Sequence, residues 1–421
     1  MLDYHAQTKH SYASVRERSG GMDWETKPNV FKIYPSNLER IFLDLENPVH
    51  HFLYRIGGVS ATKTYPTMSY ALRINPSAGA LYPTEVYVQI KEVKGFKNGL
   101  YHLCPAESSL VLLHALDENE GLERALHVTK IKGFLFLFSA LYFRSSWKYK
   151  NRAFRYCLQD TGHMLGTLEA SSTLLDTPYE IHYDFDKKAL NALFGFGAEE
   201  FFLSTACVGE TEATPTHFPT TSLPTTDGTG TFEPNAMIET VYEATCKTIA
   251  PKAQTQQPLF TLEPDHFKRT LLARRSAREF YENAISKEAF DIIMAYICQP
   301  IPSDADTAVR IYAVIHRVKD MWQGVWHEGT YLKTGNFAKK AGYLCLEQAL
   351  GAQSAVTFFF LGEDENYQAL MQKAGIIGHR LYLIANTLGI GCSGIGAYYD
   401  DEVTDFLETN GMVLYALAIG E

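Results

Sequence analysis

Periodic patterns of hydrophobic residues occupy two long blocks of this chain, and a polar stretch separates them. Block one runs through residues 41–210 and block two through 264–421, each with strand-like and helix-like apolar spacing. Residues 1–40 are polar without a sustained period, which predicts an N-terminal arm. Residues 211–263 are rich in Thr and Pro, and such a stretch buries too little apolar surface to order itself well. We therefore predict two domains joined by a linker with at most one short helix near 238–249.

The two blocks repeat a hairpin pattern at the same spacing. Block one has alternating apolar residues from Tyr87 and then Gly99-Leu-Tyr-His. Block two has alternating apolar residues from Tyr312 and then Gly324-Val-Trp-His. In both, the tyrosine precedes the glycine by twelve residues. Each pattern predicts a β-hairpin, with an alternating strand, a turn and a second strand that starts at glycine.

A second repeated spacing follows in the same order. Gly162-His163 in block one and Gly378-His379 in block two each lie 21 residues before a Tyr-Asp pair. We expect both Gly-His pairs to open amphipathic helices, and we expect both histidines to be structural, because no ligand-spaced carboxylate or Cys accompanies them. The shared spacings indicate an internal duplication. A duplicated domain can reproduce a two-fold dimer interface within one chain.

Composition and charge exclude several classes of function. The net charge is −10, so the chain lacks the basic footprint of a nucleic-acid-binding protein. It contains no run of 18 apolar residues and no apolar segment at its N-terminus, so we expect neither a membrane span nor a secretory signal. Its seven cysteines are scattered singly without any C-x-x-C, which predicts no metal site and reduced thiols in a cytoplasmic protein.

The first candidate for chemistry is a basic stretch near the start of block two. Arg274, Arg275, Ser276 and Arg278 offer three guanidinium groups and a hydroxyl within five residues. Guanidinium forks and a hydroxyl donor suit a phosphate monoester. The alternative is a solvated basic helix face.

The second candidate is a loop of small residues just before the first hairpin. It contains Pro76, Ser77, Ala78 and Gly79 and ends at Pro83. Such a loop is tight, and its backbone N–H groups can approach a flat ring closely. A flavin needs donors of this kind at its reactive edge. The alternative is an ordinary turn that precedes a strand.

The third candidate is glycine-rich and literally matches G-x-G-x-x-G. The glycine-rich segment runs from Gly389 to Gly396, and the motif itself occupies Gly389 to Gly394. We reject a dinucleotide-binding function, because that motif must follow a strand and open a helix, whereas this one follows a helix. Gly389 is expected to cap that helix. Gly394, Ile395 and Gly396 are expected to start a strand whose backbone can be approached closely by a neighbouring group.

The fourth candidate is Lys148 beside Tyr149. An ammonium next to a phenol supplies a proton donor and acceptor if both are desolvated, and we expect Lys148 to lower the pKa of Tyr149. The alternative is a basic surface turn.

Together these motifs resemble the nitroreductase family. The loop from Pro76 to Pro83 with its hairpin is similar to the SagB-type dehydrogenase branch, which includes the azoline oxidases of peptide natural products. The stretch from Arg274 resembles the phosphate-binding motif of the family, and Gly378-His-Arg-Leu-Tyr-Leu with Gly394-Ile-Gly-Ala-Tyr-Tyr-Asp resembles its later helix and flavin-side strand. The resemblance covers both blocks. It implies an α+β fold of two domains, each with a mainly antiparallel sheet flanked by helices, fused as an intramolecular pseudo-dimer.

The resemblance also implies a cofactor and roles for the candidate residues. Arg274, Arg275, Ser276 and Arg278 would hold the ribityl phosphate of FMN. Pro76, Ser77, Ala78 and Gly79 would face the isoalloxazine edge from the other half, and Gly394, Ile395 and Gly396 would lie near the ring. In azoline oxidases a Lys-Tyr pair at the place of Lys148 and Tyr149 is implicated in proton removal.

The two blocks depart from the family pattern in complementary ways. Block one lacks an R-R-S-x-R motif, and block two has Pro302-Ser303-Asp where the loop belongs. We therefore expect one FMN per chain. The expected function is FMN-dependent two-electron dehydrogenation of a peptide-like or heterocyclic substrate by a ping-pong mechanism. The alternatives are an NAD(P)H-dependent nitro- or quinone reductase and a degenerate, flavin-free binding partner in a modifying complex.

Overall fold

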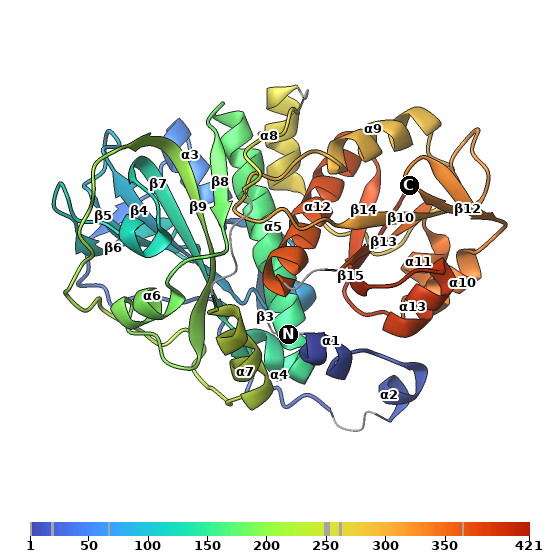
Figure 1. Ribbon diagram of the computed structural model, residues 1–421, viewed down its shortest axis with the longest axis horizontal. Helices are drawn as coiled ribbons and strands as arrows, with labels where there is room; N and C mark the ends of the chain where they lie inside the picture. The colour runs from blue at the N-terminus through green and yellow to red at the C-terminus, as the bar shows by residue number, and fades with distance from the viewer. Residues whose placement is uncertain (1, 18–20, 66–67, 248–252, 261–262, 364–365) are drawn as a thin grey trace. The chain divides into compact units, whose positions relative to one another are not determined.

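A computed structural model of the chain shows two compact units, each made of segments that are not continuous in the sequence. Unit 1 comprises residues 1–21, 259–299 and 307–421, and unit 2 comprises 22–258 and 300–306. The residues that the structure describes are 2–17, 21–65, 68–247, 253–260, 263–363 and 366–421. Figure 1 labels most helices and strands of both units.

Unit 2 is built on a seven-stranded antiparallel sheet with the order β1-β6-β5-β4-β7-β9-β8. Its strands are β1 (Arg40–Phe42), β4 (Thr84–Lys91), β5 (Gly99–Cys104), β6 (Ser109–Ala115), β7 (Lys130–Leu141), β8 (Tyr179–His182) and β9 (Glu200–Glu212). The central strand β4 is buried at every position because both of its faces are covered, which explains its near-continuous run of buried side chains.

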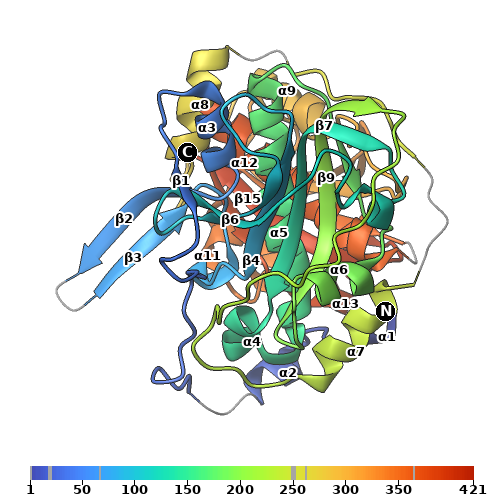
Figure 2. The ribbon, with the colours of Figure 1, turned by 90° about the vertical axis from the view of Figure 1, so that its left-hand side faces the viewer.

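One helix dominates the packing of unit 2. Helix α5 (Ala153–Leu174) packs against β4, β7 and β9, and nearly all of its side chains are buried. The other helices are α3 (Pro48–Arg55), α4 (Phe143–Tyr149), α6 (Lys187–Leu193) and α7 (Ala236–Thr245), with 3₁₀ turns at η1 (Ala78–Ala80), η2 (Glu123–Leu126) and η3 (Lys150–Arg152). A separate hairpin of β2 (Val59–Tyr65) and β3 (Met68–Arg73) projects from the sheet, as Figure 2 shows.

Unit 1 is built on a six-stranded antiparallel sheet with the order β12-β11-β10-β13-β15-β14. Its strands are β10 (Arg310–Ile315), β11 (Gly324–His327), β12 (Thr330–Thr334), β13 (Val356–Gly362), β14 (Gly391–Ile395) and β15 (Met412–Gly420). Its helices are α1 (Leu2–Gln7), α2 (Tyr12–Arg16), α8 (Pro264–Ala273), α9 (Lys287–Ile297), α10 (Ala338–Leu344), α11 (Ala349–Gln353), α12 (Tyr367–Thr387) and α13 (Asp400–Leu407). Helix α12 packs against β14, β15, α8 and α9.

The two sheets have the same topology once β1 is set aside. The order β6-β5-β4-β7-β9-β8 corresponds strand by strand to β12-β11-β10-β13-β15-β14, and a long buried helix follows the fourth strand in both. The predicted hairpins have the same register, since Tyr87 faces His102 and Tyr312 faces His327. The α+β fold of two mainly antiparallel domains is therefore confirmed, and so are both hairpins.

The predicted helix starts at the Gly-His pairs are wrong. Helix α5 begins at Ala153 and helix α12 at Tyr367, so Gly162 and Gly378 lie inside their helices. Both helices are buried on almost every side, and this removes the polar face from which a sequence pattern locates a helix start.

Segments expected to be peripheral belong to the two units. Residues 2–17 lie in unit 1, where His10 forms a bridge to Tyr399, whereas 22–40 lie in unit 2. The expected linker contributes to unit 2 up to residue 258, with α7 and a bridge between His217 and Glu120. Among the described residues, no helix is both long and apolar enough to cross a membrane.

Candidate functional site

The loop between β3 and β4 in unit 2 is held in an unusual backbone conformation. Gly79, Ala80 and Tyr82 have φ values of 66°, 53° and 47°, in the left-handed region that favours glycine. The Ser77 hydroxyl accepts a hydrogen bond from the Tyr82 amide at 2.9 Å and closes the loop. At the far end, Arg144 donates to the Tyr82 carbonyl at 2.8 Å. The loop is therefore fixed by side chains at both ends.

A buried carboxylate from α5 completes this arrangement. The Ser77 hydroxyl donates to Asp160 at 2.5 Å, and the Ala78 amide donates to the same carboxylate at 3.2 Å. Asp160 is 4% exposed, and this burial raises its pKa to about 7. Sequence reasoning missed Asp160, although an acidic residue within a buried helix is a signal that could have drawn attention to it.

The structure brings Lys148 and Tyr149 to the same loop. Both lie at the end of α4, and a β-carbon added to Gly79 would be 2.9 Å from the Tyr149 hydroxyl and 3.3 Å from the Lys148 ammonium. Tyr149 is half-buried and packs on Tyr156 at 4.2 Å between ring centroids, whereas Lys148 is exposed. Glycine suits this position because its φ of 66° is strained for other residues and because a β-carbon would crowd the Tyr149 hydroxyl.

The expected effect of Lys148 on Tyr149 is wrong. Burial raises the pKa of Tyr149 above its usual value, and the nearby Tyr156 and Asp160 raise it further. Lys148 remains in solvent, which screens its charge, while the phenol is largely desolvated. Tyr149 therefore holds its proton at neutral pH.

In unit 1, the arginine stretch begins where α8 ends. Arg274 is the C-cap residue of α8 and is buried, with its guanidinium 5.1 Å from the centroid of the Tyr382 ring. The Arg275 guanidinium donates to the carbonyl of Arg274 at 2.5 Å and is half-buried. Arg278 is exposed. The stretch is therefore not a solvated helix face, because it leaves the helix at Arg274.

Tyr382 of α12 connects this stretch to the glycine-rich strand. Its hydroxyl lies 2.9 Å from the Ser276 hydroxyl and accepts a hydrogen bond from the Gly394 amide at 2.6 Å. The Ala277 amide also donates to the Cys392 carbonyl at 2.9 Å. The arginine stretch and the glycine-rich segment, which were predicted as separate candidates, thus meet through Tyr382. Tyr382 belongs to the motif that starts at Gly378, but the sequence did not predict a role for it.

The glycine-rich segment is placed differently from the prediction. Gly389, with φ of 74°, follows the C-cap of α12, so the predicted helix cap is confirmed. Gly394 and Ile395, however, end strand β14 instead of starting it, and Gly396 follows the strand. A β-carbon at Gly394 would lie 2.1 Å from the Tyr415 hydroxyl, so close packing inside the sheet demands glycine there.

The residues present fit the chemistry of FMN in both units. Unit 1 offers a buried guanidinium, a half-buried Ser276 hydroxyl and two further arginines, a donor set suited to a dianionic phosphate. Unit 2 offers a tight loop of small residues in which Gly79 has no side chain to keep a flat ring away from the backbone. No group of three or more potential metal ligands occurs in the described part of the chain.

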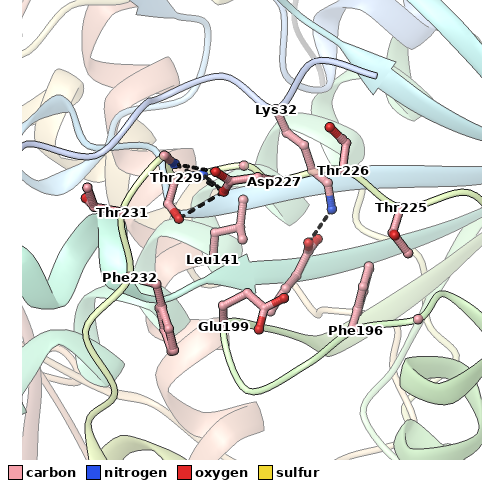
Figure 3. A pocket seen from close by; sticks show the side chains of 14 residues that line it. Lys32, Leu141, Phe196, Glu199, Thr225, Thr226, Asp227, Thr229, Thr231 and Phe232 are labelled. Atoms are coloured by element: carbon pink, nitrogen blue, oxygen red, sulfur yellow. Dashed lines mark hydrogen bonds and ion pairs between the residues drawn. The ribbon is translucent and has the colours of Figure 1, made fainter. Parts of the chain in front are cut away.

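A cavity of about 490 Å³ lies elsewhere in unit 2, shown in Figure 3. The segment 225–232, which was expected to be linker, forms one wall. On another side the buried Lys32 ammonium lies 2.5 Å from the Glu200 carboxylate. None of the residues selected from the sequence lines this cavity.

Comparisons with known proteins match part of this sequence to a family. Residues 271–421 match the nitroreductase family. This segment contains the arginine stretch, Tyr382 and Gly394. A candidate nitroreductase of Methanocaldococcus jannaschii is 33% identical over 130 residues, which is 30% of this chain. The chain spans 61% of the length of that relative.

Solved structures extend the likeness to the whole chain. A candidate nitroreductase from Anabaena variabilis has the same fold, with a TM-score of 0.83 and 22% identity over 100% of this chain and 99% of that one. The microcin synthetase McbBCD complex of Escherichia coli overlaps over 48% of this chain and 74% of that one, with 17% identity and a TM-score of only 0.33. The SagB-type branch therefore stays a prediction.

Proposed function

We propose that this protein is an FMN-dependent oxidoreductase. The observation that carries the proposal is the joined cluster of Arg274, Ser276, Tyr382 and Gly394, because it lies within the segment that matches the nitroreductase family. A buried guanidinium beside a reachable hydroxyl suits the terminal phosphate of a flavin mononucleotide. Dinucleotide binding is less well supported, because its glycine motif must follow a strand.

The chain's own residues divide the work in this proposal. Arg274, Ser276 and the neighbouring arginines bind the phosphate. FMN, when bound, supplies a two-electron acceptor or donor. Tyr149 and Lys148 exchange the proton that leaves or enters the substrate beside Gly79, and their convergence on this loop is what supports the assignment.

One FMN per chain is the proposed stoichiometry. The arginine motif is present only in the sequence of block two, and each charged hydrogen bond to a phosphate contributes about 1.5–3 kcal/mol, so a site without the arginines would bind orders of magnitude more weakly. Flavin released by denaturation and quantified against protein should give a ratio near one. Arg274→Ala combined with Ser276→Ala should abolish the bound flavin. A ratio near two would contradict the proposal.

Complete absence of flavin would favour a different class of function. If the purified protein shows no visible flavin absorbance even after FMN is added, the flavin-free binding partner becomes the better explanation. Arg269→Ala, on the exposed side of α8, is a matched control that should keep normal FMN content.

The proposed reaction is two-electron dehydrogenation of a peptide-like or heterocyclic substrate. Lys148→Ala and Tyr149→Phe should each lower oxidation of a thiazoline-containing dipeptide under O₂ by roughly 100-fold, as expected for loss of a general acid–base group, while FMN stays bound. Lys150→Ala is a control, because Lys150 is the next exposed lysine on the same segment. Full turnover by both variants would overturn the assignment.

An NAD(P)H-dependent nitro- or quinone reductase is the second candidate. The match of residues 271–421 to the nitroreductase family favours it. Rapid NADH-driven reduction of menadione, unaffected by Lys148→Ala and Tyr149→Phe, would support this candidate over dehydrogenation.

We also propose that the protein acts in the cytoplasm. All seven cysteines are free thiols in the structure, which is usual for a reducing compartment.

A further inference from the structure

One buried ionisable side chain has no role in the proposed function so far. Asp160 lies in the middle of α5 with its carboxylate 4% exposed. In the described part of the chain its side chain has two hydrogen-bond partners, the Ser77 hydroxyl and the Ala78 amide, and no cation forms an ion pair with it. Both hydrogen bonds of this carboxylate are therefore directed at the loop before β4.

Burying a carboxylate without a cation is costly, so the position needs a reason. An apolar side chain would pack more favourably in this buried helix. The loop it contacts contains three residues in the left-handed region, two of which are not glycine. Such a conformation persists only where surrounding contacts enforce it. Asp160 supplies those contacts at Ser77 and Ala78.

Unit 1 provides an internal comparison for this carboxylate. When the Gly-His pairs of α5 and α12 are aligned, Ile376 occupies the position of Asp160, and Ile376 is fully buried. The segment that precedes β10 does not form the loop, since 302–304 instead pairs with β8 through Ile181. Among the described residues between β13 and α12 there is no helix that corresponds to α4. The carboxylate, the loop and the Lys-Tyr helix are thus present together in one copy and absent together from the other.

We propose that Asp160 is a positioning residue, which holds Ser77 and Ala78 so that Gly79 stays against the Tyr149 hydroxyl and the Lys148 ammonium. This inference rests on the proposed function for its catalytic consequence. It does not require Asp160 to touch the substrate, because the carboxylate acts through the loop.

The first test measures the loop itself and needs no flavin. Hydrogen–deuterium exchange is followed by mass spectrometry on peptides that cover residues 74–82 in wild type, Asp160→Ala and Asp160→Asn. Asp160→Ala should speed exchange of the loop roughly 10- to 100-fold. This factor corresponds to losing the free energy of one hydrogen bond to a charged group. Asp160→Asn should fall between, because an amide oxygen can still accept from Ala78.

The control is Thr161→Val, one residue further along α5. Thr161 is also buried, but its hydroxyl bonds to Thr84 and not to the 77–79 segment. It should therefore leave exchange of the loop unchanged. If Asp160→Ala does not fold, Asp160→Asn and Ser77→Ala carry the same comparison.

The second test uses the FMN-loaded protein with the thiazoline-containing dipeptide under O₂, the reaction proposed to depend on Lys148 and Tyr149. At saturating FMN, Asp160→Ala should lower kcat roughly 10- to 100-fold with KM changed less than about threefold, because the approach of Gly79 to Lys148 and Tyr149 is lost. Asp160→Asn should recover part of kcat. Ser77→Ala combined with Asp160→Ala should lower kcat by less than the product of the two single effects, because the two residues share one hydrogen bond.

The outcomes separate this inference from the proposed function. A wild-type protein without FMN refutes the proposed function, while the exchange experiment still decides whether Asp160 holds the loop. Bound FMN together with wild-type exchange and wild-type kcat in Asp160→Ala refutes the role of Asp160 alone. An equal loss in Thr161→Val would also refute it, since the effect would then be general destabilisation of α5.

Discussion

The two units share one strand order but differ in which segments bring the candidate site residues together. In unit 2, the loop before β4 and the end of α4 gather Gly79, Lys148 and Tyr149. In unit 1, the segment after α8 and the end of β14 gather Ser276 and Gly394 around Tyr382. The strand order is the same in both sheets, whereas the connecting segments differ. A duplicated fold can thus divide its functional parts between copies, because connections tolerate change that packed strands do not.

The two sheets also differ at one aligned position. Glu85 in β4 corresponds to Arg310 in β10, two residues before the tyrosine that aligns the hairpins. Glu85 is buried and bonds to Arg144 at 2.6 Å and His102 at 2.9 Å. Arg310 instead forms a partly exposed pair with Glu363. The aligned position therefore belongs to a buried charge network in unit 2 and to a surface ion pair in unit 1.

The largest expected effect comes from breaking the buried network. Glu85→Ala should lower the free energy of unfolding by about 3–5 kcal/mol, because it leaves the buried charge of Arg144 without its carboxylate. Urea unfolding followed by circular dichroism measures this change. A loss below about 1 kcal/mol would show that the network in unit 2 is no more important than the surface pair in unit 1.

A pH series sharpens the comparison between Asp160 and Ile376. The folded-state pKa of Asp160 is about 7 against an ordinary value of 3.8, so between about pH 4 and 7 the folded chain keeps a proton that the unfolded chain has lost. Stability therefore falls as pH rises through this window. Asp160→Asn should remove that part of the slope, on the order of 2–4 kcal/mol, in unfolding experiments at several pH values. Parallel slopes for wild type and variant would contradict the assignment.

Two glycines in the left-handed region test whether close approach matters in unit 2. Gly389→Ala in unit 1 should cost about 1 kcal/mol from backbone conformation alone, because the space around Gly389 is open. Gly79→Ala should cost more, about 2 kcal/mol, since its β-carbon also meets the Tyr149 hydroxyl. Thermal unfolding of both variants gives the difference, and equal losses would argue against crowding at Gly79.

The smallest expected effect is at the surface pair of unit 1. Glu363→Ala should change stability by only about 0–1 kcal/mol, and less at high salt, because Arg310 keeps its hydrogen bond to the Asn410 carbonyl. Unfolding at low and high ionic strength measures it. A loss as large as that of Glu85→Ala would remove the distinction between the two copies.

Sequence patterns located the parts of the candidate site but not their connections. The arginine stretch and the small-residue loop could be selected because each depends on residues close together in the chain. Asp160 could not be assigned, since it reaches Ser77 across 83 positions, and Ser276 reaches Tyr382 across 106. No local pattern contains such contacts. The starts of α5 and α12 were missed for a related reason, because burial on all sides removes the amphipathic signal.

The sequence by itself determined the duplication, the two hairpins and the residue types at each candidate motif, because repeated spacings and short-range periodicity depend only on neighbouring residues. Tertiary structure alone decided that the Lys148 and Tyr149 side chains approach Gly79, and that Asp160 accepts hydrogen bonds from Ser77 and Ala78. It also decided the protonation of Tyr149, since the pKa of a phenol follows from how far packing removes it from water. Desolvation is produced by residues distant in the chain, and so it is a property of the folded protein only.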